Sequence, residues 1–250
     1  MKKIITAVVL VLALVSASFA DDSKKDAYQM VRLGVNLDYF MPAMDQVNTD
    51  LGKGSNVTKL NGGVGAMADL NLALLPYVMA GLRTGYLYCM PGSAEYNYII
   101  YDQKTTLNAS LIPIEVGLNI DFDIPSFPAA VMVGAYAGYG IAAASYQNDI
   151  SALGQTSTYT VPYIGGGFVG ELLATLSMKL SSVLSLNING GYKLADIPQM
   201  KQTSDVNFTG IPGITVPVGS KNSVLKDSNN NDMAFDFSGL SLGVGAALSF

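Results

Sequence analysis

The stretch Leu184-Ser185-Leu186-Asn187-Ile188-Asn189-Gly190-Gly191-Tyr192-Lys193-Leu194 decides the fold class. Its even-numbered positions are apolar apart from one glycine, and its odd-numbered positions are polar or glycine. A period of two places alternate side chains on opposite faces of a β-strand. The stretch therefore predicts a strand with one apolar face and one polar face.

The same alternation recurs along the chain, and the ionisable residues of these segments lie on the polar face. The other segments are 32–39, 64–72, 78–88, 112–122, 131–143, 168–180 and 240–250. Each is about as long as a tilted strand that crosses a bilayer. We predict an all-β protein, a closed antiparallel transmembrane β-barrel of eight strands, or ten if the last loop forms a further hairpin.

The connections between these segments alternate in length. Short turns are expected at 73–77, 123–129 and 180–183, and long loops at 42–60, 91–106, 146–162 and 195–233. Short periplasmic turns and long outer loops are typical of outer-membrane barrels. The uncharged stretch Phe127–Tyr146 is long enough for a transmembrane helix, but its glycines and its neighbouring strands favour a strand.

The N-terminus has the pattern of a cleavable signal peptide. Two lysines precede the apolar stretch Ile4–Ala17, and small residues at Ser18 and Ala20 mark a cleavage site. We predict a signal peptide at 1–20 and an outer-membrane barrel domain at 21–250. The expected location is the bacterial outer membrane.

Composition excludes several classes of function. The net charge of −5 argues against nucleic-acid binding. Gly239–Gly243 matches the G-x-S-x-G motif of hydrolases, but the chain has no histidine to serve as the base. Asp227–Asp232 begins like a calcium loop, yet Asp232 replaces the expected glycine and Ser238 the expected glutamate. We therefore expect a non-enzymatic protein with no catalytic residue, cofactor or metal site.

The end of the chain carries a family resemblance. Gly239–Phe250 alternates and ends on phenylalanine. With the pattern of the whole mature chain, it resembles the small eight-stranded outer-membrane barrels of the OmpA-transmembrane, OmpX and OmpW group. The resemblance implies that Leu248 and Phe250 form a signal for the barrel-assembly machinery, and that the barrel contacts outer-membrane lipid. The chain has no tryptophan, so its aromatic girdles would use Tyr39, Tyr86, Tyr88, Tyr139 and Tyr192 on the outer side and Tyr77, Phe122 and Phe250 on the inner side.

Five charged residues are predicted to point into the lumen. Asp69, Arg83 and Glu115 fall at similar heights on three successive strands, with Arg83 placed to fork between the two carboxylates. Glu171 and Lys193 match in height on another pair of strands. Either these ions neutralise one another and fill the barrel, or they form a gate. Inward glycines favour the gate by leaving space, namely Gly65, Gly81, Gly85, Gly117, Gly134, Gly138, Gly140 and Gly191.

Two functions follow from this reading. The first is a non-enzymatic outer-membrane barrel with a structural or surface-interaction role, working through its outer loops on an unknown surface ligand. The last loop, with its apolar run Ile211–Val218, is the longest of these. The alternative is a small porin-like channel for ions or small apolar solutes, gated by the lumen charges.

Overall fold

The structure is a computed structural model that describes residues 31–125, 127–206 and 219–250. The expected signal peptide at 1–20 and the apolar run Ile211–Val218 lie outside these residues. Within the described ranges, no helix is long and apolar enough to cross a membrane.

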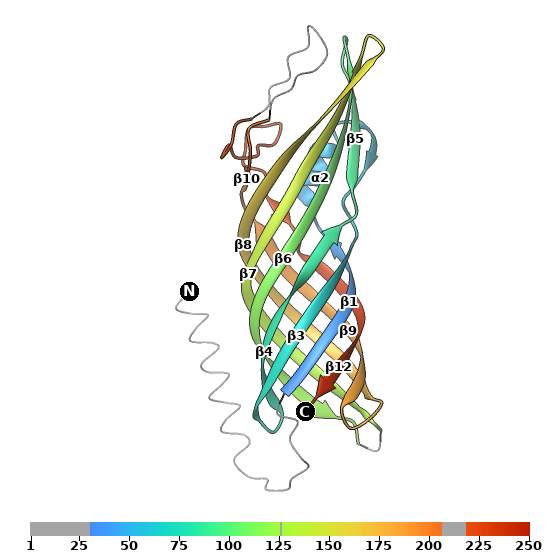
Figure 1. The fold of residues 1–250 in the computed structure, drawn as a ribbon, viewed down its shortest axis with the longest axis vertical. Coiled ribbons are helices and arrows are strands. Elements are labelled where there is room, and N and C mark those ends of the chain that lie inside the picture. The colour runs from blue at the N-terminus through green and yellow to red at the C-terminus, as the bar shows by residue number, and fades with distance from the viewer. Residues whose placement is uncertain (1–30, 126, 207–218) are drawn as a thin grey trace.

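Eight antiparallel strands form a closed ring (Figure 1). In the order of the ring they are β1 (Val31–Pro42), β3 (Gly63–Leu75), β4 (Val78–Cys89), β6 (Asp102–Asp123), β7 (Ala129–Ala152), β8 (Gln155–Lys179), β9 (Leu184–Ile197) and β12 (Gly239–Ser249). The pairing of β12 with β1 closes the ring, and Phe250 and Val31 exchange backbone hydrogen bonds of 2.9 and 3.2 Å at this seam. The predicted all-β barrel is confirmed, with eight strands in the ring.

The remaining elements lie above the ring, at the end opposite the short turns (Figure 1). They are α2 (Asp45–Leu51), β2 (Ser55–Thr58), β5 (Gly92–Asn97), β10 (Met200–Gln202) and β11 (Phe235–Asp236). β2 pairs with β5 and β5 with β6, whereas β10 pairs with β8 and β11 with β9. In α2, Val47 and Leu51 are one turn apart and share the buried face.

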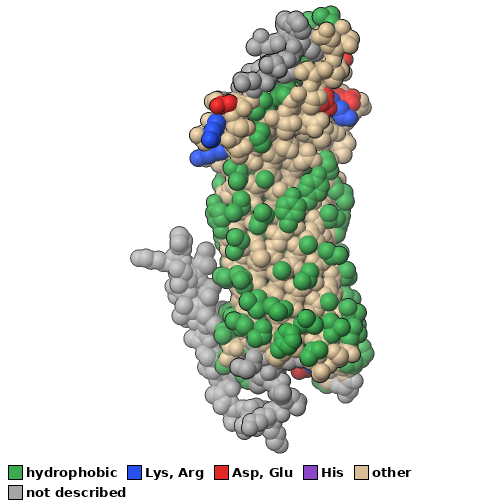
Figure 2. All heavy atoms as spheres, viewed as in Figure 1, with side chains coloured by type: hydrophobic (Ala, Val, Ile, Leu, Met, Phe, Trp, Pro, Cys, Tyr) green, Lys and Arg blue, Asp and Glu red, His purple; other side chains and the backbone are tan. Residues whose placement is uncertain are grey.

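The barrel has its apolar side chains outside and its polar side chains inside. On β1, Leu33, Val35 and Leu37 are exposed while the alternate residues, Arg32 and Asp38 among them, are buried. Apolar side chains form a band around the face shown in Figure 2. The band also holds exposed aromatic residues of both predicted girdles, including Tyr39, Tyr86, Tyr139 and Tyr192 and, nearer the short turns, Tyr77, Phe122 and Phe250. Because a closed ring pairs its backbone groups, this exterior suits lipid.

Two of the predicted long loops are wrong. Residues 102–106 belong to β6, and 146–162 form a strand hairpin that turns at Leu153-Gly154, with Ala152 paired to Gln155. β6, β7 and β8 are therefore 22, 24 and 25 residues long and stand well above the apolar band. These extensions were not predicted because the alternation reverses there. The inward positions, such as Leu107, Leu111 and Ile150, become apolar, and the outward positions become polar.

Candidate functional site: the filled lumen

Arg83 lies at the centre of the lumen and contacts three carboxylates. Its Nη1 lies 2.8 Å from Asp69 Oδ1, its Nη2 lies 3.2 Å from Asp38 Oδ2, and its Nε lies 3.0 Å from Glu171 Oε2. The side chain is 1% exposed. The register Asp69↔Arg83, set by the tight β3–β4 turn, brings the first of these pairs together.

Lys193 completes the cluster from β9. Its Nζ lies 2.9 Å from Glu171 Oε2 and 3.1 Å from Glu115 Oε2, and its side chain is also buried. Glu171 therefore bridges the two cations. We call the six residues Asp38, Asp69, Arg83, Glu115, Glu171 and Lys193 the ion network, and they come from six of the eight ring strands.

The structure brings all five predicted lumen charges into this one network. The expected pairs of Asp69 with Arg83 and of Glu171 with Lys193 are present, and one expected contact differs. Arg83 was expected to fork between Asp69 and Glu115. Although Arg83 and Glu115 are neighbours in register, Glu115 instead contacts Lys193 across the lumen. Glu171 takes its place beside Arg83, because side chains in so narrow a barrel reach past the adjacent strand. Asp38 was not among the predicted lumen residues, although it stands on the polar face of 32–39.

The ion network holds four carboxylates and two cations, all nearly inaccessible. Isolated buried charges are strongly unfavourable, and each cation here contacts at least two carboxylates. Three carboxylate oxygens of the ion network, namely Asp38 Oδ1, Glu115 Oε1 and Glu171 Oε1, are buried without a hydrogen-bond partner among the described residues. Removing one cation would therefore leave several negative groups uncompensated.

The inward glycines make room for neighbouring side chains, and the expectation that they leave open space is wrong. A Cβ on Gly243 would lie 1.9 Å from Asp38 Oδ1, and one on Gly245 would lie 2.2 Å from Asn36 Oδ1. Gly81 is covered in the same way by Asn71, Asn119 and Tyr136. Side chains from neighbouring strands thus occupy the volume that the glycines release.

A hydrogen-bonded layer lies next to the ion network, on the side of the short turns. Asn119 Nδ2 donates to Asn71 Oδ1 at 2.7 Å, and the Tyr136 hydroxyl donates to Asn119 Oδ1 at 2.9 Å. Arg32 Nη2 donates to Ser177 Oγ and Asn187 Oδ1, both at 2.8 Å. Beyond Arg32 lies a polar cavity of about 250 Å³, bordered by the turns.

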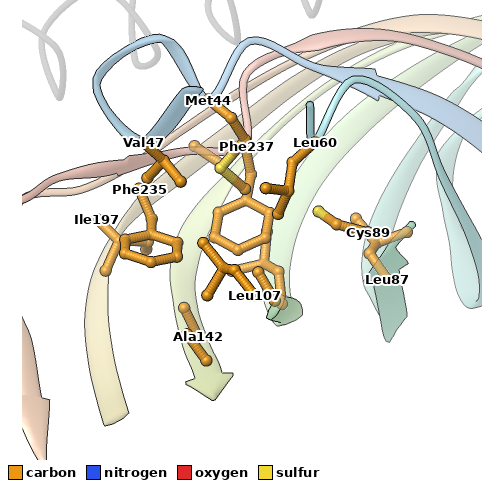
Figure 3. Close-up of a cluster of buried hydrophobic side chains, with 14 of the residues drawn as sticks. Met44, Val47, Leu60, Leu87, Cys89, Leu107, Ala142, Ile197, Phe235 and Phe237 are labelled. Carbon is orange, nitrogen blue, oxygen red and sulfur yellow. The ribbon is translucent and has the colours of Figure 1, made fainter. Parts of the chain in front are cut away.

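A large apolar cluster fills the other end of the lumen. Figure 3 shows side chains from the barrel wall, from α2 and from the segment before β12 that holds Phe235 and Phe237 meeting there. We call this cluster the apolar plug; its largest members include Phe40, Met44, Val47, Leu51, Leu60, Met67, Leu87, Leu107, Leu111, Ile197, Met200, Met233, Phe235 and Phe237, and Cys89 lies among them. The plug was not predicted from the sequence, although apolar residues such as Met67 and Leu87 stand on otherwise polar faces.

Hydrogen bonds to α2 hold the last loop over the plug. Gln46 Nε2 donates to Asp227 Oδ2 at 3.2 Å, and Gln46 Oε1 accepts from the backbone N–H of Ala234 at 2.9 Å. The other Asp227 oxygen accepts from the backbone N–H groups of Asn229 and Asn231, both at 2.9 Å. The segment considered as a calcium loop is thus a turn closed by its own hydrogen bonds. The Asn231 N–H group is the main reason that the pKa of Asp227 is lowered.

Comparisons with known proteins show likeness of fold. No family model matches the chain, and a search of curated proteins found no match. Among solved structures, Neisserial surface protein A is 11% identical, with 90% of this chain and all of that chain aligned at a TM-score of 0.37. OprG from Pseudomonas aeruginosa is 11% identical, covers 90% and 99%, and has a TM-score of 0.45. Ail of Yersinia pestis is 8% identical, covers 88% and 97%, and has a TM-score of 0.36. This chain resembles these small barrels in fold, and no function passes to it at this level of similarity.

Proposed function

We propose that the protein is a non-enzymatic barrel of the bacterial outer membrane with a filled lumen, and that it works as a structural or surface-interaction protein. The observation that carries the proposal is the filling of the lumen at two levels, by the ion network and by the apolar plug. A barrel that passes no solute leaves its outer surface as the working part. The apolar exterior supports the membrane location, and a signal peptide at 1–20 would direct export.

The outer elements support an interaction role. β6, β7 and β8 continue as a paired sheet above the apolar band, and α2, β10 and β11 close the mouth beside it. Ordered structure of this extent is more than loops need merely to connect strands, and outer loops on a rigid scaffold commonly carry binding functions.

The chemistry of the chain supports a non-enzymatic role. Ser241, the candidate nucleophile of the G-x-S-x-G match, lies within β12 and is paired in register with Gly191 and Phe40. A nucleophile elbow instead requires a sharp turn from strand to helix, together with a histidine base. The chain contains no histidine.

Assembly would use the last strand. Leu248 and Phe250 lie on the outward face at the closing seam, where both are exposed. We propose that they form the signal for the barrel-assembly machinery, since an exposed apolar end of the last strand is accessible before the ring closes. Alanine at both positions should slow assembly in cells and leave refolding in detergent unchanged; equal slowing of both would contradict the assignment.

The alternative of a small channel requires a continuous path through the lumen. Such a path would have to pass both the ion network and the apolar plug, and Phe235 and Phe237 are almost wholly buried in the plug. The alternative thus needs side-chain movement at two separate levels.

Planar-bilayer conductance of refolded residues 21–250 tests the proposal, with heat-dependent gel mobility as the check of folding. We expect no reproducible current steps from the unaltered chain. Reproducible steps whose size changes in Arg83→Ala would overturn the proposal in favour of a gated channel. Leu242→Ala, on the exposed outer face of β12, is the matched control.

A further inference from the structure

The turn between β5 and β6 presents two isoleucines to solvent. The backbone N–H of Tyr98 donates to the carbonyl of Tyr101 at 2.9 Å, and the two tyrosine rings stack with their centroids 4.6 Å apart. Ile99 and Ile100, between them, are 105% and 66% exposed. The stacked rings thus brace the turn that holds the isoleucines outward.

The turn between β7 and β8 ends beside it and presents a leucine. Asp102 pairs with Ser151 in register, and Tyr101 packs against Ile150 and Ala152. The two turns lie together at the far end of the extended sheet (Figure 1), and Leu153 is 91% exposed. We call Ile99, Ile100 and Leu153 the apolar tip.

Leucine is an unfavourable residue for the backbone conformation at position 153. Its φ is 51° and that of Gly154 is 77°, so both central residues of the turn have left-handed backbone. Two-residue hairpin turns of this kind favour Asn-Gly, because asparagine tolerates positive φ far better than a bulky apolar residue. A strained and exposed leucine gains nothing from the fold, and an unusual conformation of this sort points to function.

We propose that the apolar tip inserts into a second lipid bilayer that faces the one holding the barrel. This inference rests on the proposed surface-interaction function and names its partner as a lipid surface. Ten residues of β6, 102–111, separate the tip from the first outward apolar residue of the band, Ile112. At roughly 3.3 Å per residue the tip stands about 30 Å along the strand from its own bilayer, which it therefore does not reach.

The form of the tip favours lipid over a protein partner. The three side chains are aliphatic and stand on a convex end, whereas a protein partner would have to supply a pocket for each. Tyr98 and Tyr101 lie directly behind them, as aromatic residues do at a membrane–water interface. The tip carries no charge, and the first charged residue along β6 is Asp102. Insertion thus requires no charge to leave water.

The absence of tryptophan from the chain allows a direct test. The mature chain with Ile99→Trp, held in nanodiscs, is mixed with phosphatidylcholine vesicles that carry brominated acyl chains. We expect the emission to shift to shorter wavelength and to be quenched by bromine. Lys221→Trp, on an exposed part of the last loop, is the matched probe and should show neither change. Unchanged emission from both probes would overturn the proposal.

Vesicle flotation measures the contribution of the tip. Ile99→Ser with Ile100→Ser should weaken binding about tenfold or more, because each change removes a large apolar side chain from the lipid contact. Met90→Ser changes a residue that is 46% exposed outside the tip and should leave binding unaltered.

Leu153→Asn should weaken binding while raising the thermal stability of the hairpin, a combination that loss of folding cannot produce. Equal flotation of all variants, or association of the tips with each other in place of vesicles, would overturn the proposal. The vesicle experiments test only the apolar tip, and the conductance measurement tests only the filled lumen. Failure of the tip proposal can therefore be distinguished from failure of the proposed function.

Discussion

Arg83 on β4 contacts Glu171 on β8, three strands away around the ring, with 3.0 Å between Nε and Oε2. The same Glu171 oxygen lies 2.9 Å from Lys193 Nζ. One carboxylate thus joins the two cations and ties opposite parts of the wall together through the lumen. The ion network stabilises the ring closure as well as filling the barrel.

Glu171→Gln tests this bridging role. Loss of one charge from a buried network leaves Arg83 and Lys193 with weaker compensation, and we expect the free energy of unfolding to fall by about 3 kcal/mol. Urea titration followed by gel mobility measures the change. Glu95→Gln, in a partly exposed outer hairpin, is the control. Equal urea midpoints of unfolding for the two variants would show that the contacts of Glu171 with the two cations do not stabilise the barrel.

Gly243→Ala tests whether the inward glycines are needed for packing. A Cβ there would lie 1.9 Å from Asp38 Oδ1, so the carboxylate must move away from Arg83. We expect a loss of about 1–3 kcal/mol in the free energy of unfolding. Gly190→Ala is the matched control, because the nearest atom to its added Cβ is Leu242 Cδ2 at 3.6 Å. Similar losses for both would mean that backbone entropy, and not the approach to Asp38, decides the effect.

Phe235→Ala with Phe237→Ala tests the apolar plug. Both rings are buried, and truncation of a buried phenylalanine costs about 3–5 kcal/mol where the cavity does not collapse. We expect lower resistance to urea and exposure of α2 to protease, because Val47 and Leu51 lose packing partners. Wild-type resistance in the double variant would show that the plug contributes little.

The Asp227 turn should loosen in acid. The pKa of Asp227 is lower in the folded turn than in an unfolded chain, chiefly because the Asn231 N–H group donates to its carboxylate. Its contribution is present above the unfolded pKa of about 3.9 and is lost as the pH falls through the folded value. Hydrogen exchange at Asn229 and Asn231 should therefore accelerate in acid beyond the intrinsic rate. Asp227→Asn should show fast exchange already at pH 7; protection equal to the wild type would contradict this assignment.

The barrel could be predicted because the alternation of apolar and polar residues is visible within each strand alone. Asp69 and Arg83 could be matched because a tight turn sets their register. Contacts across the lumen, such as Glu115 with Lys193, depend on ring closure and on barrel width, which no local pattern contains. The plug was missed for a related reason, since Phe235 and Phe237 lie between the predicted last loop, 195–233, and the predicted last strand, and become buried only when the ring is closed.

Thiol labelling of Cys89 tests the sealed outer mouth most directly. Cys89 is the only cysteine of the chain, and it is fully buried in the apolar plug. A water-soluble maleimide added to the folded chain in vesicles should leave Cys89 unlabelled, while the urea-unfolded chain reacts completely. Gln155→Cys in a Cys89→Ser background, at the exposed β7–β8 turn, should label at once and serves as the positive control. Labelling of folded Cys89 at a rate near that of Gln155→Cys would show that water reaches the plug, and would contradict the account of a filled lumen.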